Sequence, residues 1–217
     1  MPAAQFAVFG HPISHSLSPR IQQAFAQQFG IALEYRTIDA APAQFDAAVR
    51  RFFDGVGVGA NVTLPHKASA FALADEHSLA ARRAGTANVL TRLADGRLAA
   101  HNTDGAGLLR DLTERHRVDL RGQHVLLLGA GGAAHGVAWP LLDAGVRALT
   151  VVNRSRAAAD ALAEAIGAPA SSCNSASTRA AVCAKSPDRR DSTWRSIEMP
   201  RRSIRASTVT SGRSKVS

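Results

Sequence analysis

The sequence is poor in the residue types that a disulfide-stabilised, thiolate metal-binding or membrane-spanning protein requires. Its two cysteines, Cys173 and Cys183, lie near the C-terminus, so the first 167 residues offer neither a disulfide framework nor a thiolate metal site. No run of about 18 apolar residues is present, and none is expected to span a membrane. The N-terminal stretch "MPAAQFAVFG" lacks a basic segment followed by a long apolar one, so we expect no secretory signal. These absences predict a soluble, cytoplasmic protein without a bound metal.

Lysine is almost absent from the same 167 residues. They contain fifteen Arg and a single Lys, which is Lys67 in the segment "GANVTLPHKASA". Arg stays protonated at biological pH, whereas Lys can exchange its proton when its surroundings favour the neutral form. A single lysine must fall somewhere by chance, so only its position and neighbours can decide whether it has a chemical role.

The positive charge is distributed unevenly. The net charge is +9, but residues 1–167 carry 16 basic and 14 acidic side chains, against 10 basic and 3 acidic ones in residues 168–217. The last fifty residues also hold 12 of the 18 serines. The basic character therefore belongs to the C-terminal segment and does not by itself indicate that the remaining chain binds nucleic acid.

Short apolar runs alternate with segments of helical periodicity through residue 167. Strands are predicted at residues 5–10, 33–39 and 56–64, and residues 87–102 predict a hairpin that turns at Asp95 and Gly96. Helices are predicted at residues 18–29, 42–55 and 105–116, with an Ala-rich helix around Lys67. Such alternation is typical of an α/β layered fold with mostly parallel strands.

The helix predicted at residues 18–29 has clear boundary signals. Ser18 suits the N-cap, Pro19 the first helical position and Gly30 the C-terminal stop. Ile21, Phe25 and Phe29 recur every fourth residue, so we expect them to form the buried face of the helix.

A second α/β unit begins with a glycine-rich turn. "GQHVLLLGAGGAAHGV" is a strand followed by a turn that opens a helix, and Gly129, Gly131 and Ala134 fit the G-x-G-x-x-G/A pattern of dinucleotide-binding proteins. Gly129 permits the tight turn and Gly131 the close approach of a pyrophosphate to the helix N-terminus. The alternative is a turn with a purely structural role.

The residues after the next strand favour NADP over NAD. An NAD protein is expected to place an acidic residue about 20 positions after the glycine-rich turn, to bind the ribose 2′-hydroxyl. Here the chain has Asn153, Arg154, Ser155 and Arg156 instead, and a guanidinium group suits a 2′-phosphate. The alternative is a solvated arginine pair at the start of a helix.

Polar side chains also gather at the predicted strand ends of the first unit. The segments "GHPISHSLSP", "NVTLPHK", "GTAN" and "HNTDG" contribute hydroxyl, amide, carboxylate and amine groups. Taken singly, each of these residues is more often a turn residue than a catalyst. Spacing alone does not show that they converge.

Taken together, these segments resemble one family. "FGHPISHSLSP", "GANVTLPHK", "GTANVL", "HNTDG" and "LLLGAGGAAHGV", in this order and at these separations, resemble shikimate dehydrogenase, from about Phe6 to Gly167. The resemblance implies an N-terminal α/β substrate domain at residues 1–104 and the first half of a Rossmann-like NADP-binding domain at residues 105–167. It also implies reversible reduction of 3-dehydroshikimate to shikimate with NADPH, in the biosynthesis of aromatic amino acids.

The resemblance further assigns roles to individual residues. Ser16 and Ser18 would bind the substrate carboxylate, and Thr63, Asn88 and Asp104 its ring hydroxyls. Lys67 would act as the general acid/base, paired with Asp104, because a carbonyl that receives a hydride also needs a proton donor. The residues implied in cofactor binding are Gly129, Ala130, Gly131, Gly132, Ala133, Asn153, Arg154 and Ser155.

The C-terminal segment departs from the family pattern. Family members continue with an Asn-Ala-Thr-Ser segment, further strands and a closing helix, whereas residues 168–217 are rich in Ser and Arg and show no sustained periodicity. We interpret this tail as disordered, and as the product of a reading-frame change or an equivalent truncation. Alternatives are a natural disordered basic tail and, more weakly, a tail that binds nucleic acid non-specifically.

A nucleotide domain without its second half predicts an exposed sheet edge and exposed apolar faces, and with them low stability and weak or absent activity. The sequence therefore supports four alternatives: a working NADP-dependent enzyme, an inactive fragment that still binds shikimate weakly, a related quinate/shikimate dehydrogenase, and a basic-tailed binding protein. A monomer and a homodimer are both compatible with it.

Overall fold

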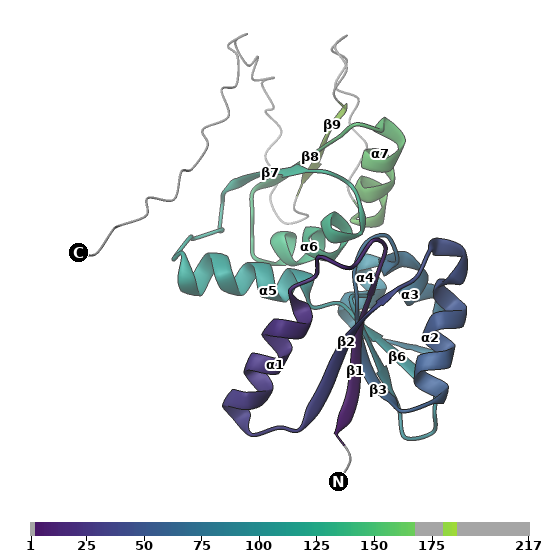
Figure 1. The fold of residues 1–217 in the computed structure, drawn as a ribbon. Coiled ribbons are helices and arrows are strands. Elements are labelled where there is room, and N and C mark those ends of the chain that lie inside the picture. Colours follow the sequence, from purple (N-terminus) through teal and green to yellow (C-terminus); the bar gives the residue numbers. More distant parts are fainter. Residues whose placement is uncertain (1–2, 168–179, 186–217) are drawn as a thin grey trace, which may run out of the picture. The chain divides into compact units, whose positions relative to one another are not determined.

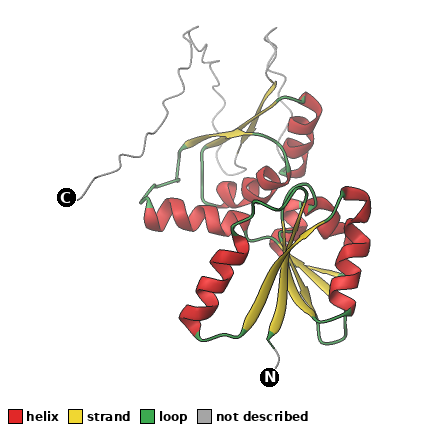
Figure 2. Ribbon diagram, in the orientation of Figure 1, coloured by secondary structure: helices red, strands yellow, loops and turns green. Residues whose placement is uncertain are grey.

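A computed structural model describes residues 3–167 and the backbone of residues 180–185, which form two β-sheets and the helices that pack on them (Figures 1 and 2). The first sheet has six strands in the order β2-β1-β3-β5-β6-β4, and the second has three in the order β7-β8-β9. The α/β fold expected from the alternating sequence pattern is confirmed.

The six-stranded sheet is mostly parallel, as expected, with β5 as its single reversed strand. β4 pairs in parallel with β6 at the far edge. β1 pairs in parallel with β2 and with β3, but β5 is antiparallel to both of its neighbours, β3 and β6. The reversal between β5 and β6 arises at the hairpin predicted around Asp95 and Gly96, where Gly96 has a φ of +87°. The strands are β1 (Ala4–Gly10), β2 (Leu33–Asp39), β3 (Gly57–Val62), β4 (Glu76–His77), β5 (Val89–Arg92) and β6 (Leu98–His101).

Seven α-helices lie within residues 3–167, and most coincide with the predicted ones. The short elements β4 and α4 were not predicted, because two- and six-residue elements show too little periodicity. The helices are α1 (Ser18–Phe29), α2 (Phe45–Asp54, after a 3₁₀ turn at Pro42–Gln44), α3 (Lys67–Leu73), α4 (Leu79–Ala84), α5 (Asp104–Arg110, continued by a π-helical turn at Asp111–Arg115), α6 (Gly132–Asp143) and α7 (Arg156–Ala165).

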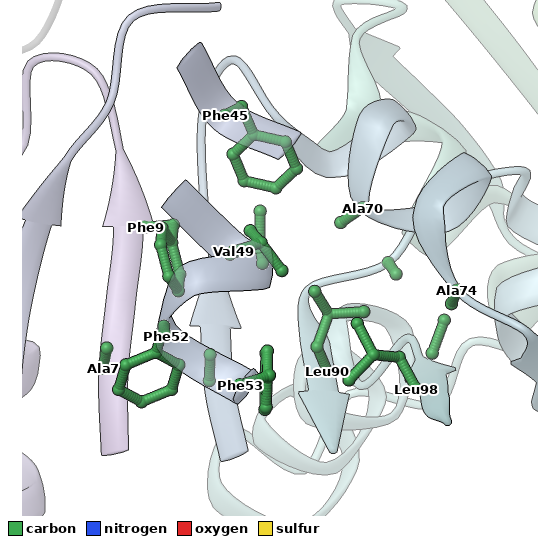
Figure 3. Close-up of a cluster of buried hydrophobic side chains, with 14 residues drawn as sticks. Ala7, Phe9, Phe45, Val49, Phe52, Phe53, Ala70, Ala74, Leu90 and Leu98 are labelled. Atoms are coloured by element: carbon green, nitrogen blue, oxygen red, sulfur yellow. The ribbon is translucent and has the colours of Figure 1, made fainter. Parts of the chain in front are cut away.

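An aromatic core joins α2 to the first sheet. Phe45, Val49, Phe52 and Phe53 lie on one face of α2 and are buried. Phe9 on β1 contacts the rings of Phe45 and Phe52 edge-on, at centroid distances of 6.0 and 5.8 Å (Figure 3). This packing fixes the ends of β1 and β3, from which two of the predicted site segments start.

The start of α1 differs from the sequence prediction. Ser18 is already the first helical residue, and Leu17 occupies the N-cap position without a side-chain cap. The hydroxyl of Ser16 accepts a hydrogen bond from the Ser18 N–H at 3.3 Å, so the serine two positions earlier provides the local side-chain acceptor. The Ser18 hydroxyl hydrogen-bonds with Tyr35 instead. The helix ends at Gly30 as predicted, with a φ of +64°.

The predicted buried face of α1 is wrong. Ile21, Phe25 and Phe29 are 47%, 52% and 69% exposed, and the buried residue of the helix is Ala26. Figure 1 shows α1 on the face of the sheet opposite α2. The helix packs on β1 and β2 through its small side chain, so its large apolar residues point away from the sheet. Periodicity identifies residues that share a helix face, but not which face meets the sheet.

The second sheet has a core on one side and exposed leucines on β7. β7 (His124–Leu128) and β8 (Ala148–Asn153) are parallel, and Leu149, Val151 and Leu162 are fully buried between β8 and its helices. Leu126 and Leu128 on β7 are 58% and 75% exposed. Exposed apolar side chains in the nucleotide unit therefore match the prediction. No helix in the described part of the chain is long and apolar enough to cross a membrane.

The interpretation of the whole tail as disordered is wrong for six residues. Ala180–Lys185 form β9, which pairs antiparallel with β8 from Asn153↔Ala180 to Ala148↔Lys185. The free edge of β8 offers backbone donors and acceptors that an adjacent extended segment can pair with, whatever its periodicity. The remainder of the tail, residues 168–179 and 186–217, lies outside the described residues.

The contrast between α1 and α2 predicts unequal effects of the same substitution. Phe45→Ala removes a fully buried ring and should lower the free energy of unfolding by about 3–5 kcal/mol. Phe25→Ala removes a half-exposed ring and should change it by less than about 0.5 kcal/mol. Urea denaturation followed by circular dichroism measures both. A Phe25→Ala loss as large as that of Phe45→Ala would show that the apolar side of α1 is covered.

Candidate active site

Lys67, Asp104 and Asn88 form a compact polar cluster. Lys67 Nζ lies 2.6 Å from Asp104 Oδ2, and Asn88 Nδ2 donates to Asp104 Oδ1 at 2.9 Å. The side chains of Lys67 and Asp104 are only 11% and 22% exposed. An ion pair so largely withdrawn from water costs desolvation free energy and is a weak way to stabilise a fold. Its placement therefore favours a chemical role, and the three residues predicted to work together are neighbours.

His66 fixes the start of the helix that carries Lys67. Lys67 is the first residue of α3, and the buried His66 stacks on Phe45 with a centroid distance of 4.4 Å. One ring nitrogen of His66, Nε2, lies 2.8 Å from the Ala40 carbonyl oxygen, to which it donates. The Lys67 carbonyl accepts a hydrogen bond from Ala87 N at 2.8 Å. The aromatic core thus positions the Lys67 backbone.

Two buried polar residues, Asn102 and Thr86, position Asp104. Asn102 Oδ1 accepts from the Asp104 N–H at 3.1 Å, and Asn102 Nδ2 donates to Thr86 Oγ1 at 3.0 Å. Thr86 Oγ1 in turn donates to the Gly132 carbonyl at 3.4 Å. Asn102 lies in the segment "HNTDG", whose polar side chains were noted, and Thr86 lies in "GTAN", but neither was given a role, because a Thr or Asn in a turn sequence looks like an ordinary loop residue. Their burial reveals the network.

Close packing joins α5, which begins at Asp104, to α6. A Cβ atom at Gly105 would overlap Pro140 Cγ and lie 2.6 Å from the Gly136 carbonyl oxygen. A Cβ atom at Gly136 would lie 3.0 Å from Asn102 Oδ1 and 3.1 Å from Asp104 Cβ. The two helices approach this closely because glycine has no side chain at either point of contact.

The segment of residues 11–17, here called the serine loop, joins β1 to α1 and carries Ser16. Tyr35 on β2 links Ser18, the first residue of α1 after this loop, to Asn61 on β3, because its O–H donates to Asn61 Oδ1 at 2.7 Å. Burial raises the pKa of Tyr35 to about 12, against the smaller opposing effect of the Ser18 hydrogen bond, so the phenol is neutral at physiological pH.

Thr63 lies where the serine loop meets the end of β3. Its N–H donates to the Phe9 carbonyl at 2.9 Å, and its methyl group lies 2.7 Å from the position of a Cβ built on Gly10. β1 and β3 are parallel neighbours, so the segments after their carboxyl ends emerge at the same sheet edge. Thr63 and the serine loop are therefore adjacent.

The glycine-rich turn leaves the N-terminus of α6 open. Gly129 has a φ of +114°, which suits glycine, and Gly131 is the N-cap residue of α6, beside Ala130 and ahead of Ala133. A Cβ built on Gly131 would meet no atom within 4 Å, whereas one on Gly132 would lie 3.2 Å from Lys67 Cβ. The turn thus presents an open helix N-terminus for an anion on one side and contacts Lys67 on the other.

Asn153, Arg154 and Ser155 lie at the end of β8, next to the glycine-rich turn. Gly129 N donates to the Val152 carbonyl at 2.7 Å, which brings the two segments together. Ser155 caps α7 by accepting from Ala158 N at 3.4 Å, and Asn153 Nδ2 donates to the Ser155 carbonyl at 3.1 Å. Arg154 is exposed in this turn, while Arg156 is paired with Asp160.

A cleft of about 420 Å³ lies between the Lys67 segment and the glycine-rich turn. Burial lowers the pKa of His135, which lines the cleft, and a hydrogen bond to the Ala84 backbone opposes this shift. A second hollow, of about 510 Å³, is lined mainly by residues 113–121 and contains none of the predicted site residues. The cleft lining includes Lys67, Arg82, Arg83, Thr86, Gly131 and Gly132.

Comparison with known protein families identifies both parts of the chain. Residues 8–90 match the shikimate dehydrogenase substrate binding domain, and residues 111–184 match shikimate/quinate 5-dehydrogenase. The chain belongs to the shikimate dehydrogenase family. The resemblance inferred from the sequence is confirmed, as is the pairing of a substrate domain with a Rossmann-like domain.

Individual relatives agree with this assignment. A shikimate dehydrogenase (NADP(+)) of Xanthomonas campestris pv. campestris is 60% identical over 169 residues, which cover 78% of this chain and 59% of that protein. The crystal structure of an Ael1 enzyme from Pseudomonas putida has a TM-score of 0.70 at 44% identity, covering 77% of this chain and 61% of that one. Shikimate 5-dehydrogenase from Thermus thermophilus, in complex with NADP(H) and shikimate, has a TM-score of 0.69 at 36% identity, with 77% and 61% covered. This chain thus spans about 59% of the length of the curated relatives that it matches.

The contact between α5 and α6 predicts that two glycines of one helix respond in opposite directions to alanine. Gly105→Ala inserts a methyl group against Pro140 and should lower the free energy of unfolding by about 1–3 kcal/mol. Gly107→Ala meets no atom within 4 Å and should raise it by about 0.5–1 kcal/mol, because alanine favours the helix. Urea denaturation measures both values. Equal effects of the two substitutions would contradict the close packing.

Proposed function

We propose that this chain carries the active site of an NADP-dependent shikimate dehydrogenase, which reduces 3-dehydroshikimate reversibly to shikimate. The observation that carries the proposal is the shielded Lys67–Asp104 pair, 2.6 Å apart, beside a glycine-rich turn that contacts the Lys67 side chain. The names of the relatives, NADP-dependent shikimate dehydrogenases, support the same substrate and cofactor.

Lys67 supplies the proton in this proposal. When the substrate carbonyl carbon gains a hydride, its oxygen becomes an alkoxide and takes a proton from the Lys67 ammonium group; the reverse reaction returns that proton to Lys67. Asp104 accepts a hydrogen bond from Lys67 and orients the amine. An arginine at this position would supply charge but could not give up its proton, which explains why this arginine-rich chain has a lysine here.

Hydroxyl and amide groups position the substrate. Ser16 and Ser18 bind its carboxylate with hydroxyl donors, while Thr63, Asn88 and Asp104 bind the ring hydroxyls. The hydrogen bond from Asn88 to Asp104 supports this assignment, because it orients both side chains together. The family resemblance and the adjacency of Thr63 to the serine loop support these substrate contacts.

Gly129, Ala130, Gly131, Gly132 and Ala133 would hold the cofactor pyrophosphate, with Asn153, Arg154 and Ser155 at the 2′-phosphate. The open space at Gly131, at the N-terminus of α6, fits this group. When bound, the cofactor supplies or accepts the hydride. The exposed Arg154 guanidinium, with no carboxylate beside it in the segment "VVNRSR", suits NADP better than NAD.

A second candidate function is shikimate binding without turnover. The exposed Leu126 and Leu128 on β7 favour it, because an uncovered apolar strand face destabilises the unit that would hold the cofactor. Quinate is an alternative substrate, since the matched family model covers both shikimate and quinate dehydrogenases.

Lys67→Ala should lower kcat for NADP reduction with shikimate by about 10²–10⁴-fold, because the general acid/base is lost. Lys67→Arg should be similarly impaired, although it keeps the charge beside Asp104. Absorbance of the reduced cofactor measures turnover, and calorimetry measures shikimate binding by the same proteins. Turnover unaffected by Lys67→Ala would disprove the role of Lys67. Binding without turnover in the unsubstituted chain would favour the second candidate.

A further inference from the structure

The serine loop is held by groups that lie outside it. On one side, the His11 N–H donates to the Leu64 carbonyl at 3.0 Å, which ties the loop to the segment that carries Lys67. On the other side lies Asp39, the last residue of β2 and the register partner of Gly10 at the end of β1. Asp39 belongs to none of the motifs that indicated the function.

Both oxygens of the Asp39 carboxylate contact residues of the serine loop. Oδ1 lies 2.6 Å from His11 Nδ1, and Oδ2 accepts from the Ile13 N–H at 3.3 Å. The hydrogen bond from His11 is the main reason why the pKa of Asp39 is lowered, and the Ile13 N–H acts in the same direction against partial desolvation. The group is therefore an ionised acceptor at neutral pH.

Ile13 connects Asp39 to the serines. Its side chain is buried with Val8 and Tyr35, its N–H is held by Asp39, and its carbonyl accepts from Ser16 N at 3.0 Å. The Ser16 hydroxyl then accepts from Ser18 N at 3.3 Å. An unbroken series of hydrogen bonds thus runs from Asp39 through one buried residue to both serines.

Two alternatives explain Asp39 less well. As a stabilising ion pair it contributes little, because its side chain is 48% exposed and that of His11 is 45% exposed. As a direct ligand it would disfavour an anionic substrate, since like charges repel. We propose that Asp39 is a positioning residue, which sets the affinity of the serine loop for a carboxylate. This inference rests on the proposed function.

The direction in which an Asp39 substitution changes the affinity for shikimate distinguishes a positioning role from a purely electrostatic one. Removing a negative charge near the serines should strengthen binding of a carboxylate if charge alone matters. Asp39→Ala should instead weaken shikimate binding, by about ten-fold, because the loop loses two hydrogen bonds. Asp39→Asn keeps one oxygen acceptor and should therefore lose less affinity for shikimate than Asp39→Ala. Asp54→Ala, which removes another exposed carboxylate, at the end of α2, is the matched control and should bind as the unsubstituted chain does.

Calorimetry with shikimate and with its methyl ester tests the proposal on the full chain. The ester lacks the anionic carboxylate, so Asp39→Ala should reduce the preference for shikimate over the ester while changing the affinity for the ester little. An equal loss for both ligands would indicate general loosening and would overturn the proposal. Tighter binding of shikimate by Asp39→Ala would overturn it as well.

If the proposed function is wrong, the calorimetric result differs from all of these outcomes, because the unsubstituted chain would bind neither shikimate nor its methyl ester. The positioning role is tested in that case by amide hydrogen exchange of the ligand-free protein. Asp39→Ala should accelerate exchange at Ile13 and Ser16 by about ten-fold, with Asp54→Ala unchanged. Unaltered protection of both amides would overturn the role of Asp39, whatever the ligand of the serine loop.

Discussion

The candidate active site depends on one interaction, between an ammonium and a carboxylate that lie 2.6 Å apart and are each largely removed from water. Either charge alone at this position would be buried without compensation, so the pair persists only while both backbones are held in place. His66 and the aromatic core hold the Lys67 side, and Asn102 with the α5–α6 contact holds the Asp104 side. These contacts on both sides position the two partners of this one interaction.

The same packing couples the substrate side to the glycine-rich turn. Gly132 contacts the Lys67 side chain and its carbonyl accepts from Thr86, which also binds Asn102. Three of the contacts that bring these groups together involve glycine, because a methyl group at any of them would need space that the neighbours occupy. The glycine-rich turn therefore has a physical role in this structure that does not depend on a nucleotide: the missing side chain at Gly132 leaves room for Lys67.

Much of the fold followed from local sequence signals, whereas the candidate site residues were proposed from the resemblance to one family. The strands, the hairpin at Gly96 and the glycine-rich turn were predicted because their causes act within a few residues. Apart from the short elements β4 and α4, the errors involved long-range packing. Periodicity placed Phe25 in the buried face of α1, Ser18 seemed a helix cap, and the tail was expected to lack any strand. Each outcome depended on a partner far away in the sequence.

The sequence by itself determined the α/β class, the family and the identity of the polar groups available for chemistry, because residue type and spacing carry that information. Only the tertiary structure decided which of these groups meet. It placed Asn102 and Thr86 behind Asp104, and it set the Asp39 carboxylate on the serine loop, 26 positions away from Ile13 in the chain. The physical reason is that a buried polar group must find a partner wherever the chain brings one within reach, and that distance is a property of the fold.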